Sequence, residues 1–171
     1  MTSIIKAKKE NAQLLSEIAK FSFIESHGNS AKSEDIDLYV TEKYSDKVFK
    51  EELSDPKNIY HIIYYNDHPA GYSKIIFDTP YPGSPIKNIT KLERLYLLKE
   101  FYNLKLGSAL FQLNIDLSKR NDQIGTWLFV WKENQRAVNF YTKNGFMVIG
   151  SRDFKISETH SNPNHLMFLK F

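Results

Sequence analysis

The chain has 171 residues, of which 42% are hydrophobic and 25% are charged, and its net charge at pH 7 is +3. These values are ordinary for one globular domain with a core of its own. No run approaches the ~20 apolar residues of a membrane-spanning helix, and the amino terminus lacks the apolar segment of a secretory signal. We therefore expect a cytoplasmic protein that does not bind membranes.

The sequence also argues against metal and nucleic-acid sites. It has no cysteine, which excludes disulfides, thiol nucleophiles and cysteine-based metal sites. The five histidines lack metal-ligand spacing, and His160 and His165 lie in a polar segment that predicts a solvated loop. The mild positive charge includes no basic block, so we expect no nucleic-acid partner and no metal.

Apolar periodicity and turn residues predict the elements in chain order. The first half should contain a strand at 3–6, a helix from Lys9 to Gly28, a helix capped by Ser33, a helix from Ser45 or Asp46 to Leu53, and hairpin strands at 59–65 and 70–77. After a proline-rich loop at 79–85, we expect a strand at 91–98, a helix at 106–120, a strand at 124–130, a helix opening at Asn134, and strands at 146–154 and 166–171. This order predicts one α/β domain, residues 1–171, with a mixed, mostly antiparallel, twisted sheet and helices on both faces.

The stretch 127–146 carries the most informative pattern. Trp127–Trp131 is an apolar run of strand formers, and Asn134 stands where a helix N-cap belongs. Ala137, Phe140 and Tyr141 follow on one helical face, and Asn144-Gly145 ends the helix. By itself the pattern fits either a ligand-binding helix or a strand–helix–strand unit with core aromatics.

The pattern resembles the carboxy-terminal half of the Gcn5-related N-acetyltransferases. The resemblance implies that Asn134 contacts the pantetheine arm of acetyl-CoA, that Ala137 lets the cofactor approach the helix, and that Tyr141 lies near the thioester sulfur. It also implies that the backbone of a splayed strand, here Tyr96, Leu97 and Leu98, pairs with the pantetheine amides.

A second stretch, 95–110, reads strand, loop, helix and resembles the pyrophosphate loop of the same family. There, loop amides and the positive end of the helix hold the pyrophosphate. The implied cofactor contacts are Asn103, Leu104, Lys105, Leu106, Gly107 and Ser108.

The match in this loop is incomplete, because Tyr102 replaces the usual Gln or Arg and Lys105 replaces the first glycine. A lysine at that position disfavours a positive φ, although its ammonium would lie near the phosphates. An ordinary strand–helix connection with one glycine is the alternative. Residues 92–97 and 130–141 most resemble the PaiA-type spermidine/spermine acetyltransferases.

The resemblance implies acetyl transfer from acetyl-CoA to a primary amine, for which a polyamine is one candidate. Glu93 is the candidate base: we expect it on the same strand face as Leu95 and Leu97, with Arg94 on the other face, and partial burial would raise its pKa. An ion pair is the equal alternative for Glu93. Tyr141 is the candidate acid for the departing sulfur, and its alternative is a hydrogen-bonded core tyrosine.

Acceptor and activity stay open at this point. Four acidic residues would attract a polyamine or form an ordinary solvated surface: Glu25, Asp35, Asp37 and Asp78. A homodimer is left open. The degraded loop at Tyr102 and Lys105 also leaves room for a CoA-binding relative that has lost catalysis.

Overall fold

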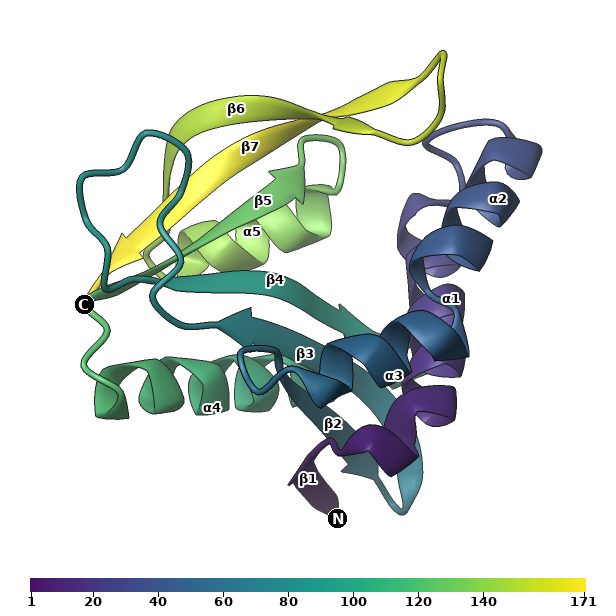
Figure 1. Cartoon of the computed structure of the whole chain (residues 1–171), viewed down its shortest axis with the longest axis horizontal. Coiled ribbons are helices and arrows are strands. Elements are labelled where there is room, and N and C mark those ends of the chain that lie inside the picture. The colour runs from purple at the N-terminus through teal and green to yellow at the C-terminus, as the bar shows by residue number, and fades with distance from the viewer.

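The computed structural model describes all residues, 1–171, around one seven-stranded sheet of order β1-β2-β3-β4-β5-β7-β6 (Figure 1). The strands are β1 (Thr2–Lys6), β2 (Ile59–Tyr65), β3 (His68–Ile76), β4 (Thr90–Leu97), β5 (Gly125–Trp131), β6 (Met147–Lys155) and β7 (Ser161–Lys170). The helices are α1 (Ala12–His27), α2 (Ser33–Lys43), α3 (Asp46–Ser54), α4 (Leu106–Arg120) and α5 (Gln135–Lys143), with short 3₁₀ helices η1 (Lys9–Asn11) and η2 (Lys99–Phe101).

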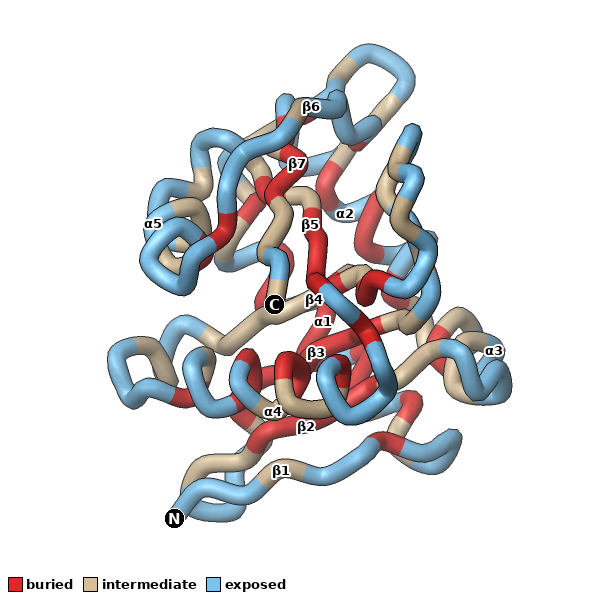
Figure 2. Tube along the Cα trace, turned by 90° about the vertical axis from the view of Figure 1, so that its left-hand side faces the viewer, coloured by how far each residue is buried: buried red, intermediate tan, exposed pale blue.

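The helices cover both faces of the sheet. On one face, α1, α2 and α3 enclose a core of 15 buried residues that includes Leu15, Phe49 and Tyr72. On the other face, α4 and α5 meet β5 and β7 in a second core that includes Phe111 and Met167. Figure 2 shows that the buried positions concentrate in the central strands and in the inner sides of the helices. The predicted α/β architecture, with its mixed and mostly antiparallel sheet, is confirmed.

The sheet divides where β4 meets β5. This is the only parallel pair, and it consists of two register positions, Thr90 with Thr126 and Lys91 with Trp127. Beyond them β5 pairs with β7 along its whole length, whereas β4 stays with β3, so the two central strands separate (Figure 1). The edge of β4 beyond Lys91 therefore has backbone groups without a strand partner, and such groups are ready to pair with a ligand.

A β-bulge in β4 overturns the predicted alternation. Leu92 pairs with Ile75 and Arg94 with Lys74, which leaves Glu93 as an extra residue. A bulge puts two successive side chains on one side of the sheet. Glu93 and Arg94 consequently both contact groups on the face of α1–α3, and the expectation that Glu93 shares a face with Leu95 and Leu97 was wrong.

The carboxy-terminal hairpin also differs from expectation. The last strand begins at Ser161 rather than Leu166, so His165 lies within β7 opposite Val130, and only His160 precedes the strand. The polar residues at 161–165 hid this strand, because β7 gains its order there from pairing with β6 rather than from burial of apolar side chains.

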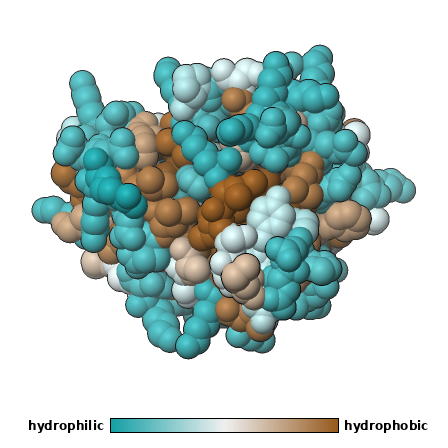
Figure 3. Space-filling model, turned by 90° about the horizontal axis from the view of Figure 1, so that it is seen from below, coloured by the Kyte–Doolittle hydropathy of each residue, from teal (hydrophilic) through white to brown (hydrophobic).

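The surface gives two further observations. Seen from below, apolar side chains form a band across the middle of the molecule between hydrophilic margins (Figure 3). None of the helices combines the length and the hydropathy that crossing a membrane requires.

Candidate active site

A first cleft opens where β4 and β5 separate, on the side of α4 and α5. Six secondary-structure elements and the loop before α4 line it. The strands contribute Leu92–Leu97 of β4, Leu128–Trp131 of β5 and Asn164 of β7. The helices and loops contribute Ser26 and His27 of α1, Tyr102, Gly107 of α4, Asn134 at the N-cap of α5, and Arg136, Ala137, Phe140 and Tyr141 of α5. The cleft thus joins the two stretches that the sequence singled out, although they are far apart along the chain.

Helix α5 presents the predicted face to this cleft. The Asn134 side-chain oxygen accepts a hydrogen bond from the Ala137 N–H at 3.2 Å, which caps the helix and leaves the amide nitrogen of Asn134 free for a ligand. Gly145, at φ +92°, lets the chain leave the helix as predicted.

Tyr141 combines a packed ring with a hydroxyl that takes no part in the hydrogen bonds of the structure. Its ring lies 5.4 Å from the rings of both Phe140 and Phe146, and the residue is buried in the second core while lining the first cleft. Burial raises the pKa of the hydroxyl well above its ordinary value of 10.0, so Tyr141 is protonated at neutral pH. The alternative of a hydrogen-bonded core tyrosine accounts for the ring but not for the hydroxyl.

The amino-terminal end of α4 has the features of an anion site. Lys105, at its N-cap, has φ 59° and ψ 13°, and Asn103 has φ 66°, so the loop takes the left-handed conformation despite the missing glycine. No side chain caps the helix, which leaves the first backbone N–H groups, those of Leu106, Gly107 and Ser108, available to an anion.

A cation that the sequence analysis missed lies next to this loop. The guanidinium carbon of Arg136 is 3.5 Å from the centroid of the Tyr102 ring, a cation–π contact between α5 and the loop, and both residues line the first cleft. Tyr102 stands at the position where the family has Gln or Arg. The stacked Arg136 therefore brings a positive charge from another element to the place where the loop sequence lacks one.

Some of the predicted site residues line the first cleft, and the others lie beside it. Those that line the first cleft are Glu93, Tyr96, Leu97, Gly107, Asn134, Ala137 and Tyr141. The others, Leu98, Asn103, Leu104, Lys105, Leu106 and Ser108, form the connection beside it. The N–H of Leu98 donates to the Ala70 carbonyl at 2.9 Å, so this amide is not free for pantetheine. Leu106 is buried in a core, so only its backbone faces outward.

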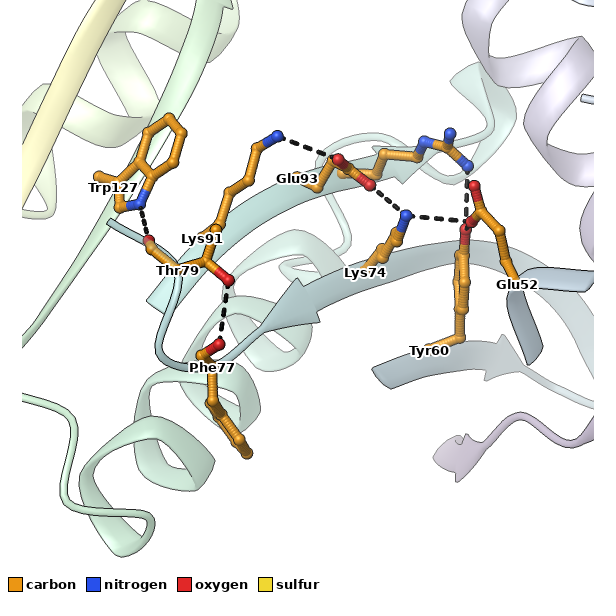
Figure 4. A network of polar contacts seen from close by, with 9 residues as sticks. Glu52, Tyr60, Lys74, Phe77, Thr79, Lys91, Glu93 and Trp127 are labelled. Atoms are coloured by element: carbon orange, nitrogen blue, oxygen red, sulfur yellow. Dashed lines mark hydrogen bonds and ion pairs between the residues drawn. The ribbon is translucent and has the colours of Figure 1, made fainter. Parts of the chain in front are cut away.

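Glu93 belongs to a chain of charges on the opposite face of β4 (Figure 4). Its carboxylate pairs with Lys74 and, at 3.0 Å, with Lys91. The Lys74 ammonium is buried and also contacts Glu52 at 3.0 Å, while Glu52 accepts a hydrogen bond from the Tyr60 hydroxyl.

This network sets the charge of Glu93. Burial works to raise the pKa of the carboxyl, but Lys74 and Lys91 more than offset burial and hold the pKa at about 2. The expected raised pKa was therefore wrong, because the sequence could not show that two lysines flank this carboxylate. The ion pair, the alternative for Glu93, is what the structure contains.

Arg94 is part of the same face. Its guanidinium donates to the Tyr60 hydroxyl at 3.0 Å and lies 4.9 Å from the centroid of the Tyr44 ring. The bulge thus directs two charged side chains of β4 to one face of the sheet, where Glu93 contacts β3 and Arg94 contacts β2 and α3.

A second cleft opens on the other side of the separation between β4 and β5, toward α2 and the β6–β7 hairpin, which bends over α2 (Figure 1). The two clefts adjoin, and seven residues line both of them: His27, Leu92, Glu93, Arg94, Tyr96, Phe129 and Asn164. A donor on one side and an acceptor on the other would come into contact at this junction.

His27 and Asn164 lie at the junction and were missed from the sequence. The His27 ring stacks on Trp131 at 5.4 Å, its Nδ1 lies 2.6 Å from the Ser26 hydroxyl, and burial lowers its pKa to about 4. Asn164 is buried, and its side-chain oxygen has no hydrogen-bond partner. One residue ends a helix and the other lies in a polar strand, so no local pattern distinguishes them.

Comparison with known proteins identifies the family. The sequence pattern of the acetyltransferase (GNAT) family matches residues 21–146. The chain belongs to this family. It is therefore an acetyltransferase, and membership implies a CoA-type small-molecule partner, as the resemblance predicted.

Named relatives agree with this assignment. An uncharacterised N-acetyltransferase of Lactobacillus delbrueckii subsp. lactis is 23% identical over 155 residues, covering 91% of this chain and 90% of the relative. The spermidine N(1)-acetyltransferase of Thermoplasma acidophilum is 26% identical over 149 residues, covering 85% and 88%. The crystal structure of the PaiA N-acetyltransferase from Thermoplasma acidophilum in complex with coenzyme A superposes with a TM-score of 0.81 at 24% identity, covering 100% of this chain and 99% of that one, which shows a shared fold.

The ion pairs of Glu93 predict a loss of stability when its charge is removed. Glu93→Gln should lower the free energy of unfolding at pH 7 by about 1–3 kcal/mol, because it leaves the buried Lys74 with one carboxylate partner. Glu158→Gln, which removes an exposed partner of Lys155, is the matched control and should change stability little. Denaturant unfolding of the three proteins measures the difference.

The pH dependence tests the same network. The folded pKa of about 2 lies below the ordinary 4.5, so the contribution of Glu93 is present above pH 4.5 and is lost as the pH falls toward 2. The stability gap between the wild type and Glu93→Gln should shrink over that window. A gap that stays constant from pH 5 to 2 would contradict the ion-pair assignment.

Because the backbone of Lys105 is strained, a glycine at this position tests the charge of its side chain separately from the conformation of the loop. Lys105→Gly should keep or raise the free energy of unfolding, by up to about 1 kcal/mol, because glycine accepts a positive φ without strain. If the ammonium contacts phosphate, the variant should still bind CoA about 2- to 5-fold more weakly while binding pantetheine as before. Isothermal titration calorimetry with CoA and with pantetheine measures both affinities, and Lys99→Ala is the control. An unchanged affinity for CoA would mean that the Lys105 side chain only faces solvent.

Proposed function

We propose that the protein transfers an acetyl group from acetyl-CoA to a primary amine at the junction of the two clefts. The observation that carries the proposal is the separation of β4 and β5, which opens a cleft lined by Asn134, Ala137 and Tyr141 and also by Gly107 in the uncapped first turn of α4. A strand edge with free amides and a helix end with free N–H groups suit pantetheine and pyrophosphate respectively.

The residues at hand fit that donor. The N–H groups of Leu106, Gly107 and Ser108 would hold the pyrophosphate, with positive charge from Lys105 and Arg136 nearby. The backbone of Tyr96 and Leu97 would pair with the pantetheine amides.

The chemistry follows from the groups at the junction. The amine nitrogen forms a bond to the thioester carbon, the carbon–sulfur bond breaks, the sulfur gains a proton and the nitrogen loses one. Tyr141, protonated at neutral pH with a free hydroxyl, is the proposed donor to the sulfur.

Glu93 is not proposed as the base, because two lysines hold its pKa at about 2, which makes the carboxylate a weak proton acceptor. The imidazole of His27 is neutral at pH 7 and lies at the junction, so we assign it the hydrogen bond that accepts from the incoming amine. Its low pKa means that a proton taken up there is soon released to solvent.

Polyamine acetylation is the narrower hypothesis, and it rests on the Thermoplasma relative. The acidic residues once considered for attracting a polyamine, Glu25, Asp35, Asp37 and Asp78, line neither cleft. Glu25 accepts a hydrogen bond from the Lys99 N–H at 2.7 Å, and Asp78 accepts one from the Gln123 side chain at 2.8 Å. The cytoplasmic location and a homodimer stay predictions.

Thiol release from acetyl-CoA over a panel of amines tests the proposal. The panel contains polyamines, amino acids, peptides with free amino termini, lysine and amino sugars. Amine-dependent release supports acetyl transfer, whereas CoA binding without release for every amine favours the non-catalytic relative.

The role of Tyr141 predicts a selective loss of turnover. Tyr141→Phe keeps the packed ring and should lower kcat by about 10²–10⁴-fold, with a melting temperature and acetyl-CoA affinity close to those of the wild type. Stopped assays under conditions where chemistry limits the rate measure the change, and Tyr65→Phe, outside both clefts, is the control.

An acyl donor with a more acidic leaving group than the CoA thiol should reduce the loss, since that group needs less protonation. Normal turnover of Tyr141→Phe with acetyl-CoA would make the tyrosine a packing residue.

A further inference from the structure

The second cleft carries an excess of positive charge. Its lining includes five cationic side chains, Lys43, Lys91, Arg94, Arg152 and Lys155, against two acidic ones, Glu93 and Asp153. Lys91 and the buried Lys74 pair with Glu93, and Lys155 pairs with the exposed Glu158, so Lys43, Arg94 and Arg152 remain against Asp153. The side facing an acceptor is therefore electropositive, which repels a polycation and favours an anion.

Three of these cations, Lys43, Arg94 and Arg152, take part in no salt bridge of the structure. Arg94 is held instead by its hydrogen bond to the Tyr60 hydroxyl, which leaves Lys43 and Arg152 for a ligand. Arg152, on the exposed strand β6, is oriented by the Phe129 ring, whose centroid lies 5.5 Å from the guanidinium carbon. Phe129 lines both clefts, so this guanidinium, which lines the second cleft, lies close to the junction. A planar fork of donors in such a position suits a carboxylate or a phosphate.

Asn164 supplies a polar atom next to Arg152. The two residues are register partners in the β6–β7 pair, and directly opposite side chains lie about 5 Å apart at Cβ. Asn164 lines both clefts, is 8% exposed, and its side-chain oxygen has no hydrogen-bond partner. A buried acceptor without a partner costs stability unless a ligand N–H satisfies it. An amine at the junction would do so.

From these contacts we infer that the acceptor is a primary amine that carries an acidic group, a carboxylate or a phosphate, a few bonds away from the nitrogen. Arg152, with Lys43 at the rim, binds the acid, and Asn164 accepts a hydrogen bond from the amine. This rests on the proposed function and narrows its substrate class.

The same charges help the reaction. A cationic surrounding disfavours a second positive charge, so it lowers the pKa of the bound ammonium group and raises the neutral fraction that can attack the thioester. The acid group of the ligand offsets the repulsion that a simple alkylamine or a polyamine would meet.

The test compares three amines that share a three-carbon skeleton: 3-aminopropanoate, propylamine and 1,3-diaminopropane. Calorimetry measures their binding to the CoA-saturated protein, and thiol release measures their turnover. We expect the acid-bearing amine to bind at least 10-fold more tightly than the diamine. A second set, aminoethyl phosphate with ethylamine and ethylenediamine, shows whether phosphate or carboxylate is preferred.

Charge reversal at Arg152 tests whether this side chain is the source of the preference for acid-bearing amines. Arg152→Glu should weaken binding of the acid-bearing amine at least 10-fold and shift the preference toward the diamine, while CoA affinity stays unchanged. Arg152→Gln should give an intermediate loss, and melting temperatures check that both variants fold. Arg120→Glu is the matched control, an exposed arginine on α4 that lines neither cleft.

The outcomes separate the two proposals. A diamine that binds as tightly as the acid-bearing amine, or an order of preference that survives Arg152→Glu, overturns the acidic-acceptor proposal. If the acid-bearing amine binds as expected but no thiol is released, the proposed ligand class is supported and acetyl transfer to that amine is refuted.

Discussion

The separation of β4 from β5 is the constraint on which the rest of the structure depends. Their parallel contact ends after Lys91 and Trp127, and beyond that point β5 pairs only with β7 and β4 only with β3. A continuous sheet would satisfy its own backbone groups; here one strand edge stays available and the gap joins both faces. The two clefts adjoin at this gap, so in the proposed reaction a thioester on one side would reach an amine on the other without either ligand crossing the core.

The charge network on β4 determines which groups are left for chemistry. The bulge turns Glu93 toward Lys74, and the resulting ion pairs hold its pKa at about 2. A carboxylate in that state stabilises the fold but is a weak proton acceptor. The groups left for the proposed chemistry are instead a neutral His27 and an unpartnered Asn164 at the junction and a protonated Tyr141 in the first cleft. Together they suit hydrogen bonding to an amine and proton donation to a sulfur.

The start of α4 shows how a binding loop can depart from its family pattern and keep its geometry. Lys105 takes the left-handed conformation that glycine usually supplies, which costs about 1 kcal/mol, and no side chain caps the helix. Arg136, stacked on Tyr102, brings a charge from α5 to the same place. The incomplete sequence match therefore does not imply that the phosphate site is lost. Phosphate binding requires free N–H groups and positive charge rather than particular residue types.

Local patterns in the sequence were enough for the element types, the cap at Asn134, the turn at Gly145 and the family, since each depends on spacing within one element. The direction of Glu93, in contrast, depended on how β4 registers with β3, and a bulge of one residue reverses a prediction based on alternation. The pKa of Glu93 likewise depended on Lys74, which lies on another strand. The lining of the second cleft, on which the proposed acceptor site rests, depended on how Arg152 and the β6–β7 hairpin lie next to α2 and β4. These are contacts between residues distant along the chain, so only the tertiary structure decided them.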